Sequence, residues 1–226
     1  SLLYVLRGLA YEDVPLNSGF LRPWRFVLNE DGLFNPSFPK AVVAGNVETS
    51  QRIVDAIVRA LGVQAASQGT MNNLTIGTRQ GALYETIAGG AGAGPDVGGG
   101  SAVQVHMTNT RATDIEELEH RFPLRILRWM RRKNSGGLGR TNGGDGVIKE
   151  WLFLDDADVA LLATRRKQPA SGLKGGEAGS VGVDLCDRGH GWEAMPSSWK
   201  AKKGDKMRIE TPGGGGYGPK KTRRRN

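Results

Sequence analysis

The chain has little of what disulfide, metal or membrane chemistry needs. It contains one cysteine and three histidines among 226 residues, and no run of about 18 apolar residues that could cross a bilayer. The lone Cys186 cannot form an internal disulfide and is expected to be a small buried residue, which fits a reducing, cytoplasmic compartment. The histidines, His106, His120 and His190, stand far apart. No spacing of cysteine and histidine therefore predicts a metal site in this chain.

Nucleotide-binding signatures are missing too. No Gly-Lys-Ser or Gly-Lys-Thr follows a glycine-rich turn, as a P-loop requires. The glycine run at 89–94 follows a strand candidate, but no amphipathic helix comes after it, as a dinucleotide fingerprint requires. No motif of this chain therefore predicts binding of ATP or NAD.

The positive charge is concentrated at one end. The net charge is +8, and removing the five basic residues of the tail at 219–226 lowers it to +3. Such a tail is usually a solvated, disordered arm, so nucleic acid is not an expected partner. At the other end, residues 2–9 begin inside an apolar helical pattern that lacks the features of a signal peptide. The chain is therefore expected to be a fragment, a processed chain or a subunit of something larger.

Glycine is abundant: the chain has 34, about twice the ordinary share of roughly 7%. The glycines cluster at 89–100, 134–146, 172–182 and 213–218 without a three-residue period, which excludes collagen. Such clusters indicate either flexible linkers or ordered backbone that approaches other groups closely. The ordered alternative is favoured at 89–100, because polar residues of catalytic type flank it and no Ser, Lys or Glu tract solvates it.

Periodicity predicts an α+β fold: a β-rich single domain over 1–218, with glycine-rich loops and a few helices. The clearest helix is expected at 47–61, with Asn46 as its N-cap and Gly62 as its stop. Its polar run at 48–52 indicates either a solvated face or a helix N-terminus aimed at an anion. Shorter helices are expected at 2–9 and from Thr113 to Pro123. Strands are expected at 24–28, 74–77, 83–87, 102–107, 124–131, 147–154, 159–164 and 207–210, with a hairpin turn at 79–81 and the last strand at an edge or half buried.

Side chains of catalytic type stand on both sides of the 89–100 run. Glu85 precedes it, and four polar residues follow it: His106, Asn109, Thr110 and Arg111. Arg111 could hold a carboxylate or phosphate in a fork, and the glycine amides could stabilise a developing oxyanion.

His106 has two interpretations. If 102–107 is a strand, its side chain shares a face with Gln104 and Thr108. It could then act as a general acid or base, or it could be a hydrogen-bonded structural histidine.

Motifs along almost all of residues 1–218 resemble the C-terminal part of the hydantoinase B/5-oxoprolinase family. They occur in the family's order: PLNSG (15–19) with RP (22–23), AGNVETSQR (44–52), ASQGTMNN (66–73), YETI (84–87) with GGAGAG (89–94), HMTNTR (106–111), GGLG (136–139) with GGDG (143–146), and ETPGGGG (210–216). The tail after Gly218 lies outside the family pattern.

The resemblance implies an ATP-dependent hydrolase of cyclic amides, of the 5-oxoprolinase or N-methylhydantoinase type. ATP phosphorylates the amide oxygen and makes an unreactive amide a better electrophile. A hydantoinase A-like ATPase subunit would supply the nucleotide site, and this chain would form part of the substrate and hydrolytic site of a cytoplasmic hetero-oligomer. The predicted catalytic residues are Glu85, His106, Asn109 and Arg111, and the predicted substrate-binding residues are Asn72, Asn73, Gly89, Gly90, Gly92, Gly94 and Thr110.

The resemblance also implies what this chain lacks. The family's B part is longer, and its metal-binding Asp and His residues are expected in an N-terminal portion. ATP and a divalent metal are therefore both expected on a partner chain or on that portion, and the chain alone should be inactive. Two alternatives remain: a subunit of an ATP-dependent acetone or acetophenone carboxylase, and a non-catalytic structural or interaction subunit.

Overall fold

The computed structural model describes residues 1–10, 15 and 17–220; the predicted basic tail lies outside this part from residue 221 onward. The helical elements are α1 (Leu2–Leu9), the 3-10 helix η1 (Ser18–Leu21), the π-helical turn η2 (Gly45–Thr49), α2 (Ser50–Ala60) and α3 (Ile115–Arg121). The strands are β1 (Asn73–Thr78), β2 (Gly81–Thr86), β3 (Leu124–Arg132), β4 (Gly146–Phe153), β5 (Ala157–Leu162), β6 (Val183–Asp187), β7 (Trp192–Ala194), β8 (Ser198–Ala201) and β9 (Lys206–Glu210).

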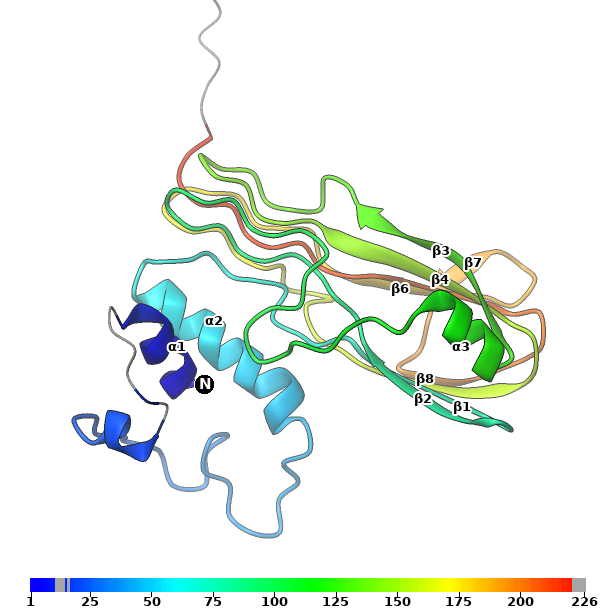
Figure 1. Ribbon diagram of the computed structural model, residues 1–226, viewed down its shortest axis with the longest axis horizontal. Helices are drawn as coiled ribbons and strands as arrows, with labels where there is room; N and C mark the ends of the chain where they lie inside the picture. Colours follow the sequence, from blue (N-terminus) through cyan, green and yellow to red (C-terminus); the bar gives the residue numbers. More distant parts are fainter. Residues whose placement is uncertain (11–14, 16, 221–226) are drawn as a thin grey trace, which may run out of the picture.

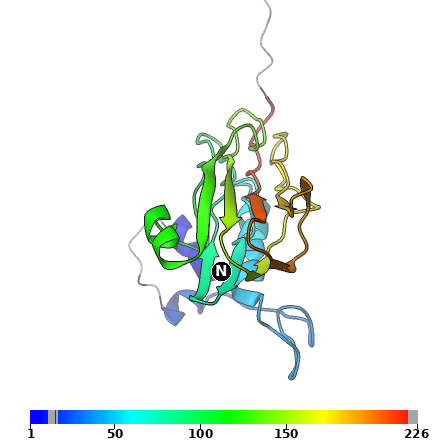
Figure 2. The ribbon, with the colours of Figure 1, turned by 90° about the vertical axis from the view of Figure 1, so that its right-hand side faces the viewer.

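The strands form two antiparallel sheets that pack face to face (Figures 1 and 2). One sheet has the order β2-β1-β5-β8, and the other has the order β3-β4-β9-β6-β7. Along β5 buried and exposed residues alternate, as a strand with one face on a core requires. The core joins both sheets: the ring of Phe153 on β4 meets the ring of Trp199 on β8 edge to face, with centroids 5.7 Å apart. The predicted α+β, β-rich single domain is confirmed.

The helices lie outside this sandwich, with α1 and α2 together at one end and α3 beside β3 (Figure 1). A small apolar cluster of Val5, Val54 and Val58 joins α1 to α2. The predicted stop at Gly62 is confirmed, since its φ is +73° and its amide donates to the carbonyl oxygen of Arg59. The predicted N-cap at Asn46 is wrong: the helix begins as a π-helical turn after Ala44, which has no side-chain cap.

The glycine clusters are ordered, and they pack against one another beyond the end of the sheets (Figure 1). We call the segments 89–100, 135–146, 170–182 and 211–218 the glycine layer. The last segment is hydrogen-bonded to each of the other three: Ala93 N donates to Gly215 O at 2.9 Å, Gly137 N to Gly214 O at 2.8 Å and Leu173 N to Gly216 O at 3.0 Å. A strand in a sheet has at most two neighbours, whereas segment 211–218 has three. The glycine layer is therefore a bundle of extended segments and not a sheet.

At several positions inside this bundle only glycine fits. A Cβ on Gly144 would lie 1.8 Å from the carbonyl oxygen of Gly100, and one on Gly214 would lie 1.9 Å from that of Ala91. Both gaps are far below any real carbon contact, as at the crowded axis of collagen. The glycine content therefore reflects close backbone packing, and the linker alternative is excluded for these segments.

Two predicted strands do not form. Residues 24–28 have no sheet partner, and they belong to an irregular, exposed stretch at 24–43. At 102–107 the only pairing among the described residues is a bridge between Gly89 and Val103, and Ala102 and His106 have φ values of +54° and +53°. Left-handed residues reverse the chain, so the side-chain alternation expected there is lost.

The remaining differences concern the second sheet. β9 lies between β4 and β6 in its interior, so the expected edge position is wrong, although its half-buried alternation is confirmed. The sequence patterns did not indicate β6, β7 and β8. These strands are three to five residues long, too short for a clear period. The predicted strands β1 to β5 and the hairpin between β1 and β2 are confirmed.

Candidate functional site

A buried ion pair ties the two sheets together. Glu85 extends from β2 and Lys149 from β4, and both carboxylate oxygens lie 2.7 Å from the Lys149 Nζ. The two side chains are only 4% and 2% exposed. The ring centroids of Trp129 and Trp151 each lie 5.2 Å from the same ammonium. Burial lowers the pKa of Lys149, and the charge of Glu85 opposes that effect.

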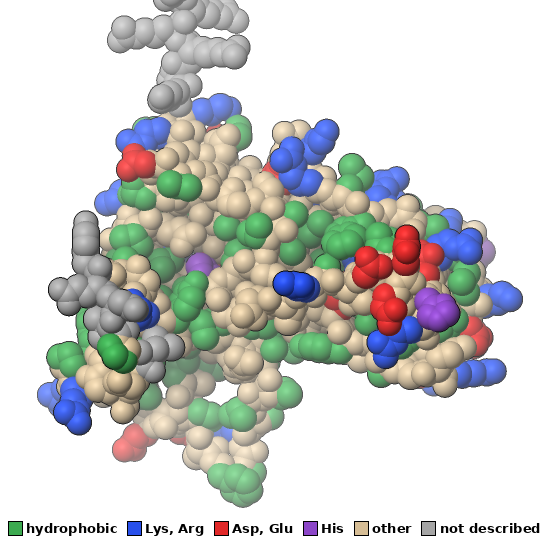
Figure 3. All heavy atoms as spheres, viewed as in Figure 1, with side chains coloured by type: hydrophobic (Ala, Val, Ile, Leu, Met, Phe, Trp, Pro, Cys, Tyr) green, Lys and Arg blue, Asp and Glu red, His purple; other side chains and the backbone are tan. Residues whose placement is uncertain are grey.

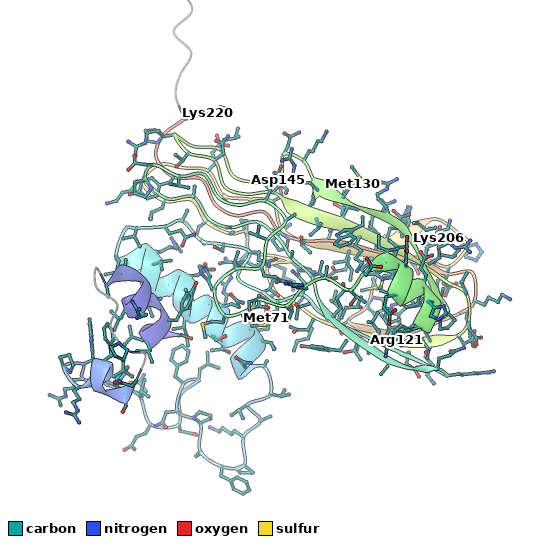
Figure 4. All side chains as sticks on the ribbon, viewed as in Figure 1. Met71, Arg121, Met130, Asp145, Lys206 and Lys220 are labelled. Carbon is teal, nitrogen blue, oxygen red and sulfur yellow. The ribbon has the colours of Figure 1, made fainter. Side chains whose placement is uncertain are left out.

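This ion pair borders a cavity of about 490 Å³, which we call the Glu85 cavity. Gln104 and Thr110 also line it, and Trp129 and Met130 of the edge strand β3 form its outer wall. Figure 4 labels Met130 on that strand. The Thr110 hydroxyl hydrogen-bonds to the hydroxyl of Thr86. The cavity thus combines two charged groups, hydroxyls and an aromatic surface.

His106 faces a different cavity, of about 440 Å³, which we call the His106 cavity. Its Nε2 lies 3.2 Å from Oδ1 of Asp55 on α2, and both side chains are nearly fully buried. The other oxygen of Asp55 accepts a hydrogen bond from Arg165 at 2.8 Å. A carboxylate that binds one nitrogen of an imidazole fixes the ring's orientation and leaves the other nitrogen to exchange a proton. Because Gln104 and His106 line separate cavities, they do not share a face as predicted.

Asn72 and Asn73 belong to a buried polar network beneath α2. The Asn73 Nδ2 donates to Glu48 Oε1 at 3.2 Å, and the Asn72 Oδ1 accepts from Arg166 at 2.7 Å. The Glu48 carboxylate also accepts from the hydroxyls of Thr70 and Thr164, each at 2.8 Å. Burial raises the pKa of Glu48 above its ordinary value, while these hydroxyls counteract the rise. Both asparagine side chains are therefore bound within the protein, and neither lines the Glu85 cavity or the His106 cavity.

Asn109 and Arg111 lie on the surface. Both are exposed, and neither makes a side-chain hydrogen bond or ion pair within the part of the chain that the structure describes. They follow His106 on the segment that leads to α3. Of the predicted catalytic residues, the structure thus brings no two to the same cavity.

The amides of the first glycine run are all used inside the protein. Each donates to a protein acceptor at 2.9 to 3.1 Å: Gly89 to Val103 O, Gly90 to Pro212 O, Ala91 to Gly100 O, Gly92 to Ser67 Oγ, Ala93 to Gly215 O and Gly94 to Val97 O. An oxyanion hole needs amides that point at the reacting oxygen, so these amides do not form one. Gly92 and Gly94 line the His106 cavity, whereas Gly89 packs against Gln68 and Gly90 against Gly144.

Three charged residues in the clusters around Glu85 and His106 were not identified from the sequence: Asp55, Lys149 and Arg165. A signal existed for two of them. Asp55 adjoins Val54 and Val58 on the buried face of α2, and Lys149 is buried in an otherwise largely apolar strand. A charged residue at a core position is rarely buried without a partner. Arg165 has a φ of +62° and follows β5 in a loop, where no period exists to mark it.

Metal binding has no support in this geometry. Among residues 1–10, 15 and 17–220, no three His, Cys, Asp or Glu side chains gather closely enough to hold a metal ion. In the same part of the chain, no helix is both long and apolar enough to span a bilayer. Cys186 is buried in the core and its thiol pKa is raised by burial, as expected for a packing residue.

A family model described as hydantoinase B/oxoprolinase matches residues 1–220, and the chain belongs to this family. It is 45% identical to a 5-oxoprolinase of Dictyostelium discoideum over 96% of this chain and 18% of that protein. It is 30% identical to the B component of a putative D-/L-hydantoinase of Pseudomonas sp. over 95% of this chain and 38% of that protein. The chain therefore spans less than a fifth of the first relative and less than half of the second.

Two solved structures share the fold. An ATP-dependent caprolactamase from Pseudomonas jessenii superposes with a TM-score of 0.61 at 24% identity, covering 70% of this chain and 30% of that one. A nucleotide-free acetone carboxylase superposes with a TM-score of 0.56 at 19% identity, covering 69% of this chain and 26% of that one. At such identities the likeness concerns the fold alone.

Proposed function

We propose that the chain forms part of the substrate and hydrolytic site of an ATP-dependent cyclic-amide hydrolase of the 5-oxoprolinase or hydantoinase type. The observation that carries the proposal is the 45% identity with a 5-oxoprolinase over 96% of this chain. Such a match covers nearly the whole chain and does not depend on one motif. An unstrained amide is activated by phosphorylation of its oxygen, and a hydantoinase A-like subunit or domain would carry the ATP.

Glu85, His106, Asn109 and Arg111 are the proposed catalytic residues. The Asp55 carboxylate orients His106, so that its free nitrogen can accept or return a proton at the His106 cavity. Glu85 and Thr110 would contact a ligand in the Glu85 cavity instead. Asn109 and Arg111 are exposed, so they would reach substrate only where a second polypeptide covers them. Gly92 and Gly94 would form part of the wall of the His106 cavity, and Asn72, Asn73, Gly89 and Gly90 would support the walls from behind.

The described residues offer no metal cluster, so a divalent metal is proposed on the partner chain or on the remaining part of the B-type polypeptide. ATP is proposed on the hydantoinase A-like partner. The proposed assembly is a cytoplasmic hetero-oligomer, and this chain contributes walls and proton-transfer groups to it.

The test is turnover by the reconstituted assembly, measured as ATP-dependent ring opening of 5-oxoproline and of hydantoin. His106→Gln should lower kcat by about 100-fold or more, the usual scale of a lost general acid or base, while the exposed His120→Gln on α3 serves as the matched control. Equal turnover of these two variants would remove His106 from the reaction. ATP-dependent carboxylation of acetone without any ring opening would favour the ketone carboxylase alternative.

Glu85 needs a second variant, because Glu85→Gln leaves the buried Lys149 without its counter-charge. The double variant Glu85→Gln/Lys149→Met removes both charges and keeps similar volume. If Glu85 acts on substrate, the double variant folds but stays inactive. If Glu85 only anchors the sheets, the double variant recovers both stability and turnover. Undiminished turnover in the Glu85 and His106 variants alike would leave the non-catalytic alternative.

A further inference from the structure

The most exposed apolar surface of the molecule is the segment 24–43, which we call the apolar arm. Nine large apolar side chains in it are exposed: Trp24, Phe26, Val27, Leu28, Leu33, Phe34, Phe38, Val42 and Val43. Phe38 is 98% exposed and Val43 86%. Figures 1 and 2 show the arm standing away from the sheets, and Figure 3 shows apolar atoms over the lobe that projects below α2. A protein chain rarely leaves so many contiguous apolar groups in water.

Polar contacts give the arm a defined shape. The Asp31 carboxylate accepts hydrogen bonds from the amide and hydroxyl of Ser37, at 3.1 and 2.7 Å, and forms an ion pair with Lys40. These contacts lower the pKa of Asp31 to about 2, first through Lys40 and then through Ser37. These three polar side chains are thus paired with one another, while the large apolar side chains of the arm face outward. This distribution is typical of a surface that another protein covers.

The arm also forms one wall of a groove against α2. Leu33 and Phe34 lie opposite Ile53 and Ile57, and the groove encloses about 460 Å³. The buried carboxylate of Glu48 and the hydroxyl-bearing Thr164 lie at its border. An apolar segment of another polypeptide fits such a groove, because its side chains of Leu or Phe size would pack against these four apolar side chains, while an acidic or polar group of the same segment would meet Arg52, which also lines the groove.

We infer that the apolar arm and this groove are the docking surface for the remaining part of the B-type polypeptide; the inference rests on the proposed function. The matched region, arm included, occupies 18% of the 5-oxoprolinase and 38% of the shorter hydantoinase B component. More than half of the shorter protein therefore lies outside the match. In that protein, which is named as a separate B component, the unmatched part is joined to the matched region in one polypeptide and is therefore available to cover the arm.

The test measures binding of this chain to the remaining B-type part, produced as a separate polypeptide, without ATP or substrate. Val43→Ser and Phe38→Ser should each weaken binding about tenfold or more, as for buried apolar contacts at an interface. Val97→Ser, a valine of the glycine layer that is 72% exposed, is the matched control and should change binding less than about twofold. Because all three side chains are exposed, circular dichroism should show unchanged folding.

Three outcomes would overturn the inference. Equal binding of Val43→Ser, Phe38→Ser and Val97→Ser would show that the arm is not the contact. Dimerisation of this chain alone, abolished by Val43→Ser, would make a second copy the occupant. Arm-dependent binding to the hydantoinase A-like ATPase alone would make that protein the occupant. Since no turnover is measured, these outcomes are separate from failure of the proposed enzymatic activity.

Discussion

Removing one member of the Glu85–Lys149 pair should lower the free energy of unfolding strongly, whereas removing both members should change it little. Its members come from different sheets and are 4% and 2% exposed, so either charge left alone would be buried without compensation. Breaking such a pair usually costs about 3–5 kcal/mol. For a domain of this size, each kcal/mol corresponds to roughly 2–4 °C in Tm, so Lys149→Met or Glu85→Gln should lower Tm by roughly 6–20 °C.

The double variant should behave differently. Burial already lowers the pKa of Lys149 despite the adjacent carboxylate, which means that desolvation offsets much of the attraction. Removing both charges should therefore leave the free energy of unfolding within about 1.5 kcal/mol of the wild type. Urea and thermal unfolding of the wild type, both single variants and Glu85→Gln/Lys149→Met complete the double-mutant cycle.

Two results would refute this reasoning. Single variants that cost less than about 1 kcal/mol would mean that water reaches the pair, as at an exposed salt bridge. A double variant as unstable as either single variant would mean that the pair contributes through its shape and hydrogen bonds and not through compensation of charge.

Further variants address the other buried groups. Burial raises the pKa of Glu48 above its ordinary 4.5. Its contribution to stability is thus intact below about that pH and is lost as pH rises through the raised value. In urea unfolding, Glu48→Gln should therefore gain stability relative to the wild type as pH rises above that ordinary value; a falling difference would contradict this. Gly144→Ala, whose Cβ would lie 1.8 Å from a carbonyl oxygen, should cost more than about 3 kcal/mol or prevent folding, whereas Gly8→Ala, with nothing within 4 Å, should change stability by less than about 1 kcal/mol. Asp55→Asn, which leaves Arg165 buried without a counter-charge, should cost about 3–5 kcal/mol by the same measurement; a cost below about 1 kcal/mol would show that Arg165 finds another partner.

Local patterns were sufficient to predict much of the sandwich. The hairpin of β1 and β2 and the helix α2 follow from apolar periods and from Gly81 and Gly62 at the turns. The pattern at 102–107 was misleading because alternation assumes extended backbone, and His106 is left-handed. Only contacts with the rest of the fold impose that conformation.

The candidate site was less predictable for a related reason. The sequence identified His106 and Glu85 as side chains of catalytic type. Their partners, Asp55 and Lys149, lie 51 and 64 positions away in sequence. A single sequence does not show which distant charges meet. A single sequence also does not show that Glu85 and His106 line different cavities. Their separation follows from a chain reversal near His106 and not from sequence spacing.

The order of synthesis has a consequence for the glycine layer. Its segment 211–218 is the last of the four to be made, yet it hydrogen-bonds to all three of the others. The earlier segments can pair with one another during synthesis, but backbone groups such as the amides of Ala93, Gly137 and Leu173 lack their partners until segment 211–218 has emerged. This part of the molecule can assemble only after residue 218 has been made, and a chain truncated before residue 211 should be a substrate for chaperones and proteases instead of a smaller folded unit.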